Sequence, residues 1–204
     1  MTTPSVVPRS RPWRNVAVVA VTAGLFMGLL DLSIVTIVIP EMGRSLDAGF
    51  GQLSWVVNAY VLMEAAVILP AGKLGDLFGR RAVFVSGMAV FAVSSLLCGL
   101  APNPEMLIAS RALQGLGGAA MVTLSLPLLT QLLPENRSLA WTVWSATGGL
   151  ALALGPSLGG LLTETLSWRW VFVVNVPVAV VAVPLIVVLV QETGEIFDDP
   201  QRLL

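Results

Sequence analysis

The stretch GKLGDLFGRR, residues 72–81, separates two long apolar runs of this sequence. Three of its ten residues are glycines, which permit a tight reversal of the chain and a close approach of neighbouring helices. Asp76 lies at the end of the first apolar run and can pair with Arg80 or Arg81 at the start of the next. The stretch therefore predicts a charged turn that joins two apolar helices.

The composition on either side of this turn is too apolar for an ordinary soluble domain. Hydrophobic residues make up 56% of the 204-residue chain and charged residues 11%, with a mean hydropathy of +0.87. A soluble domain usually carries about a quarter charged residues because its surface faces water, whereas helices that face lipid need no polar coat. We therefore expect a membrane protein rather than an unusually apolar soluble bundle.

Several classes of site are disfavoured by the residue counts. The formal net charge of -1 argues against a nucleic-acid partner, which clustered basic residues would bind. The chain has no histidine and a single cysteine, Cys98, so the usual zinc-site spacings are missing. No nucleophile, base and metal ligands cluster as in an enzyme. We expect no cofactor, no metal site and no enzymatic activity.

Six apolar runs are long enough to cross a bilayer as helices, since about 20 residues suffice. The first run is too long for the core of a signal peptide, so it is expected to be a retained span. The predicted organisation is a cytoplasmic tail over residues 1–14, a transmembrane domain over 15–191 and a second cytoplasmic tail over 192–204. The predicted spans are 16–40, 53–72, 82–101, 106–128, 138–162 and 170–190.

The orientation follows from the basic residues, because cytoplasmic loops carry the excess of lysine and arginine. With the N-terminus inside, only Arg44 and Arg169 lie outside. The inside set is larger and consists of Arg9, Arg11, Arg14, Lys73, Arg80, Arg81, Arg137 and Arg202. The asymmetry predicts a multi-pass protein of the cell membrane with both termini in the cytoplasm.

Three ionisable residues fall inside predicted spans, where a charge at the helix centre costs about 2.5–3.5 kcal/mol. With a rise of about 1.5 Å per residue, Asp31 lies roughly 22 Å from the inner face and Arg111 roughly 8 Å from the outer face. In a hydrocarbon core about 30 Å thick these two levels coincide. The sequence therefore predicts a buried Asp31–Arg111 pair, with Glu64 near the midplane of its own span.

The stretch 72–81 resembles the signature between the second and third helices of major facilitator transporters. Leu77 stands where that family usually has a basic residue. In the family this cluster also touches the C-terminal half of the transporter and helps to latch one conformation. The matching positions are Gly72, Leu74, Gly75, Asp76, Gly79, Arg80 and Arg81.

Further segments resemble motifs of the family's drug:proton antiporter branch. The fourth-helix motif looks like Leu107-x-x-x-Arg111-x-x-Gln114-Gly115-x-Gly117, and its arginine is implicated in proton coupling. The segments around Leu30-Asp31 and over 167–177, SWRWVFVVNVP, are similar to those of the fourteen-span subfamily. The fifth-helix antiporter motif is matched at Gly155, Pro156, Gly159 and Gly160, with Ala151 in place of the leading glycine.

These glycine motifs have a second interpretation, because small residues also bring membrane helices close together without any role in transport. The order of the motifs along the chain favours the family resemblance. The resemblance implies the N-terminal six-helix half of a major facilitator fold, an all-α membrane domain built from two three-helix repeats.

The resemblance also implies a function, proton-coupled efflux of small hydrophobic or cationic drugs. Asp31 would be the embedded acidic site, Arg111 its electrostatic partner, and Glu64 a second carboxylate for a proton or a cationic substrate. Family members cross the membrane twelve or fourteen times, so the chain would be a fragment or a half-transporter that pairs with a missing C-terminal half or a second copy. The alternatives are a non-transporting membrane fragment or scaffold, and a carrier of another small molecule.

Overall fold

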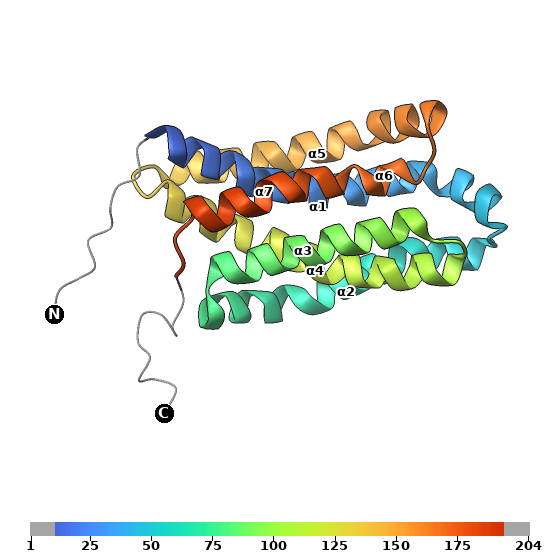
Figure 1. Cartoon of the computed structure of the whole chain (residues 1–204), viewed down its shortest axis with the longest axis horizontal. Coiled ribbons are helices and arrows are strands. Elements are labelled where there is room, and N and C mark those ends of the chain that lie inside the picture. Colours follow the sequence, from blue (N-terminus) through green and yellow to red (C-terminus); the bar gives the residue numbers. More distant parts are fainter. Residues whose placement is uncertain (1–10, 194–204) are drawn as a thin grey trace.

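The computed structural model describes residues 11–193, which form an all-helical bundle (Figure 1). The tail residues 1–10 and 194–204 lie outside the described part of the chain. The helices are α1 (Arg11–Leu46), α2 (Phe50–Phe78), α3 (Arg80–Leu100), α4 (Pro104–Leu132), α5 (Arg137–Thr165), α6 (Trp170–Val173) and α7 (Asn175–Leu189).

The helices have the length and composition of membrane spans. Within residues 11–193, six stretches are long and apolar enough to cross a bilayer, and α6 with α7 makes the last of them, Trp170–Leu189. No strand occurs in this part of the chain. The predicted all-α membrane fold with six spans is therefore confirmed.

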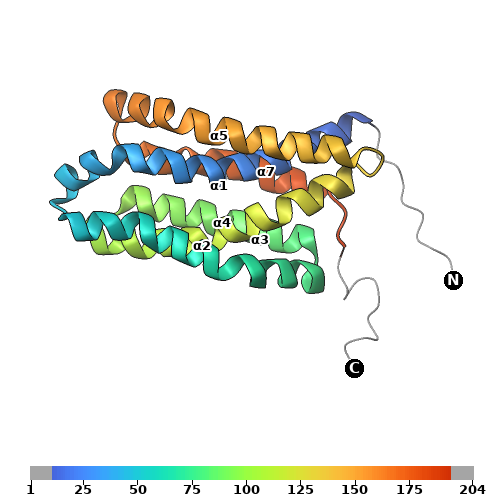
Figure 2. The same ribbon diagram turned by 180° about the vertical axis from the view of Figure 1, so that it is seen from behind.

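Helix pairing shows two related halves, α1–α3 and α4–α7. The first helix of each half packs most extensively against the second helix of the other, so that α1 lies along α5 and α4 lies along α2. The third span of each half also packs against the first helix of the other, α3 on α4 and α7 on α1. Figures 1 and 2 show this arrangement from opposite sides. This reciprocal pairing is the one expected of two three-helix repeats.

All junctions between the six spans lie at the two ends of the bundle (Figure 1). The start of α1, the α2–α3 and α4–α5 junctions and the end of α7 lie at one end, and the α1–α2, α3–α4 and α5–α6 junctions lie at the other. Asn103 and Asn136 begin α4 and α5, because each side-chain oxygen accepts the backbone N–H three residues later, at 2.9 and 3.0 Å. The charged turn of residues 72–81 therefore shares one end with the first residues of α1 and the last of α7.

The helices extend beyond the predicted spans. Helix α1 begins at Arg11, inside the predicted tail, and continues through Pro40 to Leu46, so the connection to α2 is only residues 47–49. Hydropathy marks only the part of a helix that suits the apolar layer, while backbone hydrogen bonding carries the helix further into the polar region. The predicted span 16–40 therefore covers only part of α1, and the division into two tails and a membrane domain stays a prediction.

The sixth span, predicted as one helix over 170–190, is divided into α6 and α7 at Val174, whose backbone keeps helical angles (φ −60°, ψ −23°). Pro177 has no N–H to donate to the carbonyl of Val173, four residues earlier, so the helical ladder is interrupted there. Asn175 follows Val174 and is 3% exposed. The sixth span therefore carries a polar side chain inside the bundle.

Candidate functional site

An ion pair between Asp31 of α1 and Arg111 of α4 lies in the interior of the bundle. Each residue is 1% exposed, and Arg111 Nη1 donates to Asp31 Oδ2. The pairing predicted from matched depth in the membrane is thus confirmed as a contact. Removal of one partner of such a buried pair strongly destabilises the folded protein, because the other charge is left uncompensated.

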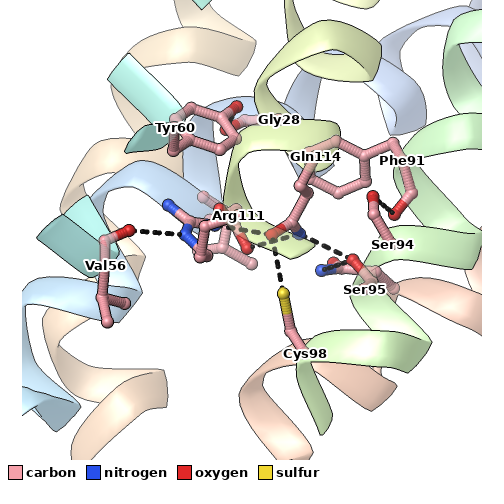
Figure 3. A network of polar contacts seen from close by, with 12 residues as sticks. Gly28, Val56, Tyr60, Phe91, Ser94, Ser95, Cys98, Arg111 and Gln114 are labelled. Atoms are coloured by element: carbon pink, nitrogen blue, oxygen red, sulfur yellow. Dashed lines mark hydrogen bonds and ion pairs between the residues drawn. The ribbon is translucent and has the colours of Figure 1, made fainter. Parts of the chain in front are cut away.

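The guanidinium of Arg111 is enclosed on several sides. Its Nε donates to the carbonyl of Val56 at 3.1 Å, and Nη1 also donates to Oε1 of Gln114 at 2.6 Å. The ring of Tyr60 lies 4.2 Å from the guanidinium carbon, a distance at which the aromatic face attracts a cation. Helix α2 therefore supplies two of the groups that compensate the Arg111 charge (Figure 3).

Gln114 links the ion pair to other helices (Figure 3). Its Nε2 donates to Asp31 Oδ1 at 3.0 Å and to Ser95 Oγ of α3 at 2.7 Å. Asn175 Nδ2 of α7 donates to the same Ser95 oxygen at 3.2 Å. Sequence reasoning quoted Gln114 as a motif position without a role and missed Ser95 and Asn175. The available signal was the presence of polar residues inside apolar runs.

Glu64 lies near the ion pair but outside its hydrogen-bond network. It is 9% exposed and lies one helical turn from Tyr60. A Cβ atom added at Gly118 of α4 would lie 3.6 Å from Glu64 Oε1, which locates the carboxylate against α4. Within residues 11–193 no group donates a hydrogen bond to it. The structure therefore brings Asp31 and Arg111 together and leaves the Glu64 carboxylate unpaired among the described residues.

Charged residues of the turn 72–81 take part in two separate ion pairs. Asp76 pairs with Arg80 at 3.1 Å, and both side chains are substantially exposed. Arg81 pairs with Glu192 at 3.2 Å, with side chains 30% and 13% exposed. Of the two predicted partners for Asp76, Arg80 is the one in contact. Glu192 was expected only as the first residue of a tail.

Glu192 completes the first turn of α3. Its carboxylate accepts the backbone N–H of Arg81 at 3.0 Å and of Ala82 at 2.9 Å, and an acid is favourable at a helix N-terminus. Arg81 Nη1 in turn donates to the carbonyls of Val187 and Val190 at the end of α7, both at 3.0 Å. The end of the sixth span is therefore fastened to the start of the third.

Two glycines of the charged turn differ in what they do. Gly79 has a φ of 98°, which non-glycine residues rarely adopt, and a Cβ atom there would overlap the Glu192 carboxylate. A Cβ atom at Gly72 would lie 3.5 Å from the Thr123 methyl carbon, an ordinary contact. Gly79 is therefore required by the reversal and by Glu192, while the space around Gly72 admits a small side chain.

The fifth-helix motif lies partly against α1. A Cβ atom at Gly155 would overlap Ser33 and come 3.0 Å from the backbone nitrogen of Ile34, and one at Gly159 would come 3.2 Å from the Ile34 carbonyl oxygen. A Cβ atom at Gly160 would meet nothing within 4 Å, and Pro156 is exposed. Gly155 and Gly159 thus allow α5 to pack closely against α1 at Ser33 and Ile34, just after Asp31 in the sequence.

Comparison with protein families gives one match that covers most of the chain. The family model described as Major Facilitator Superfamily matches residues 21–202. The chain is also 40% identical over 181 residues to the tetracenomycin C resistance and export protein of Streptomyces glaucescens, covering 88% of this chain and 33% of that protein. It is 37% identical over 171 residues to the multidrug transporter protein MdtP of Bacillus subtilis, covering 83% and 31%.

A solved structure with the same arrangement of helices is a bacterial homolog to the human lysosomal transporter Spinster, in an inward-facing and unoccupied conformation. It aligns with a TM-score of 0.70 and 18% identity, over 89% of this chain and 43% of that chain. At this identity the likeness concerns the fold alone. The chain spans about a third of the length of the curated relatives it matches.

Proposed function

Because this chain belongs to the major facilitator superfamily, we propose that it supplies the N-terminal six-helix half of a proton-coupled drug efflux antiporter. The observation that carries this proposal is the buried Asp31–Arg111 pair, in which a carboxylate of α1 contacts a guanidinium of α4. The matched relatives, named for tetracenomycin C resistance and export and for multidrug transport, support drugs as the substrate class, and small hydrophobic or cationic drugs are our proposal.

The pair provides a physical link between a proton and the separation of helices. In the paired state, moving α1 away from α4 strands a charged carboxylate and a charged guanidinium in a region of low dielectric, which costs several kcal/mol. A proton on Asp31 removes one charge and the attraction at once. Gln114 Oε1 and the Val56 carbonyl still accept from Arg111. Protonation of Asp31 therefore makes the separation of α1 from α4 less costly.

Glu64 is the proposed second carboxylate, for a proton or for a cationic substrate. The residue is 9% exposed, and no group within residues 11–193 donates a hydrogen bond to its carboxylate. A buried, unpaired carboxylate is costly as an anion and gains from either a proton or a cation. Removal of Glu64 should therefore weaken transport of cationic compounds more than transport of neutral ones.

The cytoplasmic end is the proposed contact with the other half of the transporter. Asp76 and Arg80 are exposed and pair only with each other among the described residues, so both are available to a partner surface. We place both termini in the cytoplasm of the cell because of the distribution of basic residues. The second half would be a C-terminal domain or a second copy of this chain, because six helices form only one wall of a pathway between two domains.

The test is a chimaera in which this chain replaces the N-terminal six helices of MdtP from Bacillus subtilis. We expect it to drive efflux of a cationic dye from vesicles when a proton gradient is imposed, and Asp31→Asn to abolish that efflux at equal protein level. The chain alone should give no efflux as a monomer. Efflux that continues unchanged in Asp31→Asn, or a folded chimaera without any efflux, would overturn the proposal. Coupled efflux by a crosslinked dimer of the chain alone would identify a second copy as the partner.

A further inference from the structure

The Gln114 amide lies beside the direct contact between the Asp31 carboxylate and the Arg111 guanidinium, and it hydrogen-bonds to both. Its oxygen accepts from Arg111 Nη1 at 2.6 Å and its nitrogen donates to Asp31 Oδ1 at 3.0 Å. An amide nitrogen has two hydrogens, and the second is directed at Ser95 Oγ, 2.7 Å away. Both ends of the amide are therefore engaged, and two of its contacts lie outside the ion pair, with Ser95 Oγ and with Cys98 Sγ, which donates to Gln114 Oε1 at 3.6 Å.

Ser95 Oγ is the point at which α3 and α7 reach the site (Figure 3). It accepts from Gln114 and, at 3.2 Å, from Asn175 Nδ2. Ser95 and Gln114 are 0% exposed and Asn175 is 3% exposed, so water cannot substitute for either hydrogen bond. A buried amide without its partners costs about 1–3 kcal/mol, which makes the contact a strong restraint on all three side chains.

The adjacent serine has a different arrangement. Ser94 Oγ donates to the carbonyl of Val90 at 2.7 Å, inside its own helix, and contacts no member of the network. The two serines share the same helix, a similar burial and the same chemistry. They differ only in the direction of the hydroxyl, which provides a matched control.

We infer that Ser95 and Asn175 are positioning residues that hold the Gln114 amide against both Asp31 and Arg111. Asn175 donates a hydrogen bond to Ser95, and Gln114 donates one to Ser95. Asn175 can therefore position Gln114 only through Ser95. The coupling role of this restraint rests on the proposed function. When Asp31 is neutral or has moved away, a restrained Gln114 keeps its oxygen on Arg111, so the guanidinium is not stranded.

The experiment uses the full 204-residue chain in lipid nanodiscs, labelled with nitrogen-15 in the glutamine side chains. The Gln114 amide signal is assigned by its loss in Gln114→Met, and its hydrogen exchange with water is measured by nuclear magnetic resonance. We expect Ser95→Ala to accelerate this exchange about five-fold, as loss of one net hydrogen bond implies. Asn175→Ala should give a smaller acceleration, about two-fold, since it acts through Ser95.

Three further variants test whether the restraint on Gln114 acts through the Ser95 hydroxyl. Ser94→Ala should leave the Gln114 exchange unchanged, and Ser95→Thr, which keeps the hydroxyl, should restore it toward the original rate. Asn175→Ala added to Ser95→Ala should have no further effect, because the link through which it acts is gone. Equal effects of Ser94→Ala and Ser95→Ala, or additive effects of Ser95→Ala and Asn175→Ala, would overturn the inference.

The same variants in the chimaera separate this inference from the proposed function. We expect Ser95→Ala to lower the ratio of proton-driven to gradient-free dye efflux, with Ser94→Ala unchanged. A chimaera that never transports while Gln114 exchange follows the expected pattern defeats the proposed function and leaves the positioning role standing. A working antiporter with no exchange difference defeats the positioning role alone.

Discussion

The charge pairs of this protein occur in two very different settings. Asp31 and Arg111 are each 1% exposed and lie inside the bundle, whereas Asp76 and Arg80 form a pair at its end with side chains 56% and 39% exposed. The chemistry is the same, a carboxylate against a guanidinium. The difference lies in what happens when one partner is lost, because water compensates a stranded charge at the surface and cannot do so in the interior.

A third pair lies between these extremes and shows a further distinction. Arg81 and Glu192 are partly exposed, yet each also holds backbone groups at the ends of α7 and α3. The number of hydrogen bonds made to backbone, and not the charge pairing alone, separates this pair from Asp76–Arg80. The contribution of each ion pair should therefore follow burial and backbone contacts rather than distance.

The turn of residues 72–81, which carries the exposed pair, is predicted to face the cytoplasm, and this orientation has an all-or-none test. Single cysteines at Glu135 and Thr165, in a Cys98→Ala background, lie at opposite ends of the bundle. In cells, the cysteine at 165 should react with a membrane-impermeant reagent, and the one at 135 should react only after the membrane is opened. Reversed labelling would place Asp76 and Arg80 outside and overturn the assignment.

The largest energetic effect is expected at the buried pair. Asp31→Asn or Arg111→Gln alone should destabilise the chain by about 3–5 kcal/mol, because the remaining charge is buried without a partner. The double variant should lose less than the sum of the two single losses. The measurement is a double-mutant cycle of unfolding in mixed micelles. Additive losses would mean that the two side chains do not interact in the membrane.

An intermediate effect is expected where α7 is fastened to α3. Arg81→Ala removes the ion pair to Glu192 and two hydrogen bonds to α7 carbonyls, and we expect a loss of about 1–3 kcal/mol. Glu192→Ala should cost a similar amount and should couple to Arg81→Ala in the same unfolding assay. Lys73→Ala is the control, because no ion pair of this residue occurs within residues 11–193. A loss at Arg81 no larger than that at Lys73 would remove the distinction between the two surface pairs.

The smallest effect is expected at the exposed pair. Asp76→Asn should change the unfolding free energy by at most about 1 kcal/mol, as for other exposed ion pairs. The change should shrink further at high salt, which screens exposed charges. A loss as large as that of Asp31→Asn would break the comparison. It would also show that Asp76 stabilises the half-domain itself, beyond any contact with the second half.

The sequence was sufficient for the spans and for the buried pair, and the reason is geometric. Position along a span gives the depth of a residue in the membrane, so Asp31 and Arg111 could be matched. Depth does not tell which way a side chain faces around its helix. Ser95 and Asn175 were therefore missed, although both stand in apolar runs.

The helix ends were the least predictable part of the fold. Hydropathy ended the first span at residue 40, but α1 continues to Leu46 because polar residues can extend a helix outside the apolar layer. Glu192 was missed for a related reason. Its role depends on a contact with the start of α3, 111 residues earlier in the chain, which no local pattern reveals.

That separation has a consequence for the order in which the protein is made. The α2–α3 reversal and the first turn of α3 leave the ribosome long before Glu192, which satisfies their backbone N–H groups. At about 5–20 residues per second, the gap is roughly 6–20 s. During biosynthesis the third span must therefore wait in the membrane with an unfinished end, and Glu192, just after the sixth span, completes it. A ribosome stalled before residue 192 should hold a nascent chain whose α2–α3 turn is still open to protease.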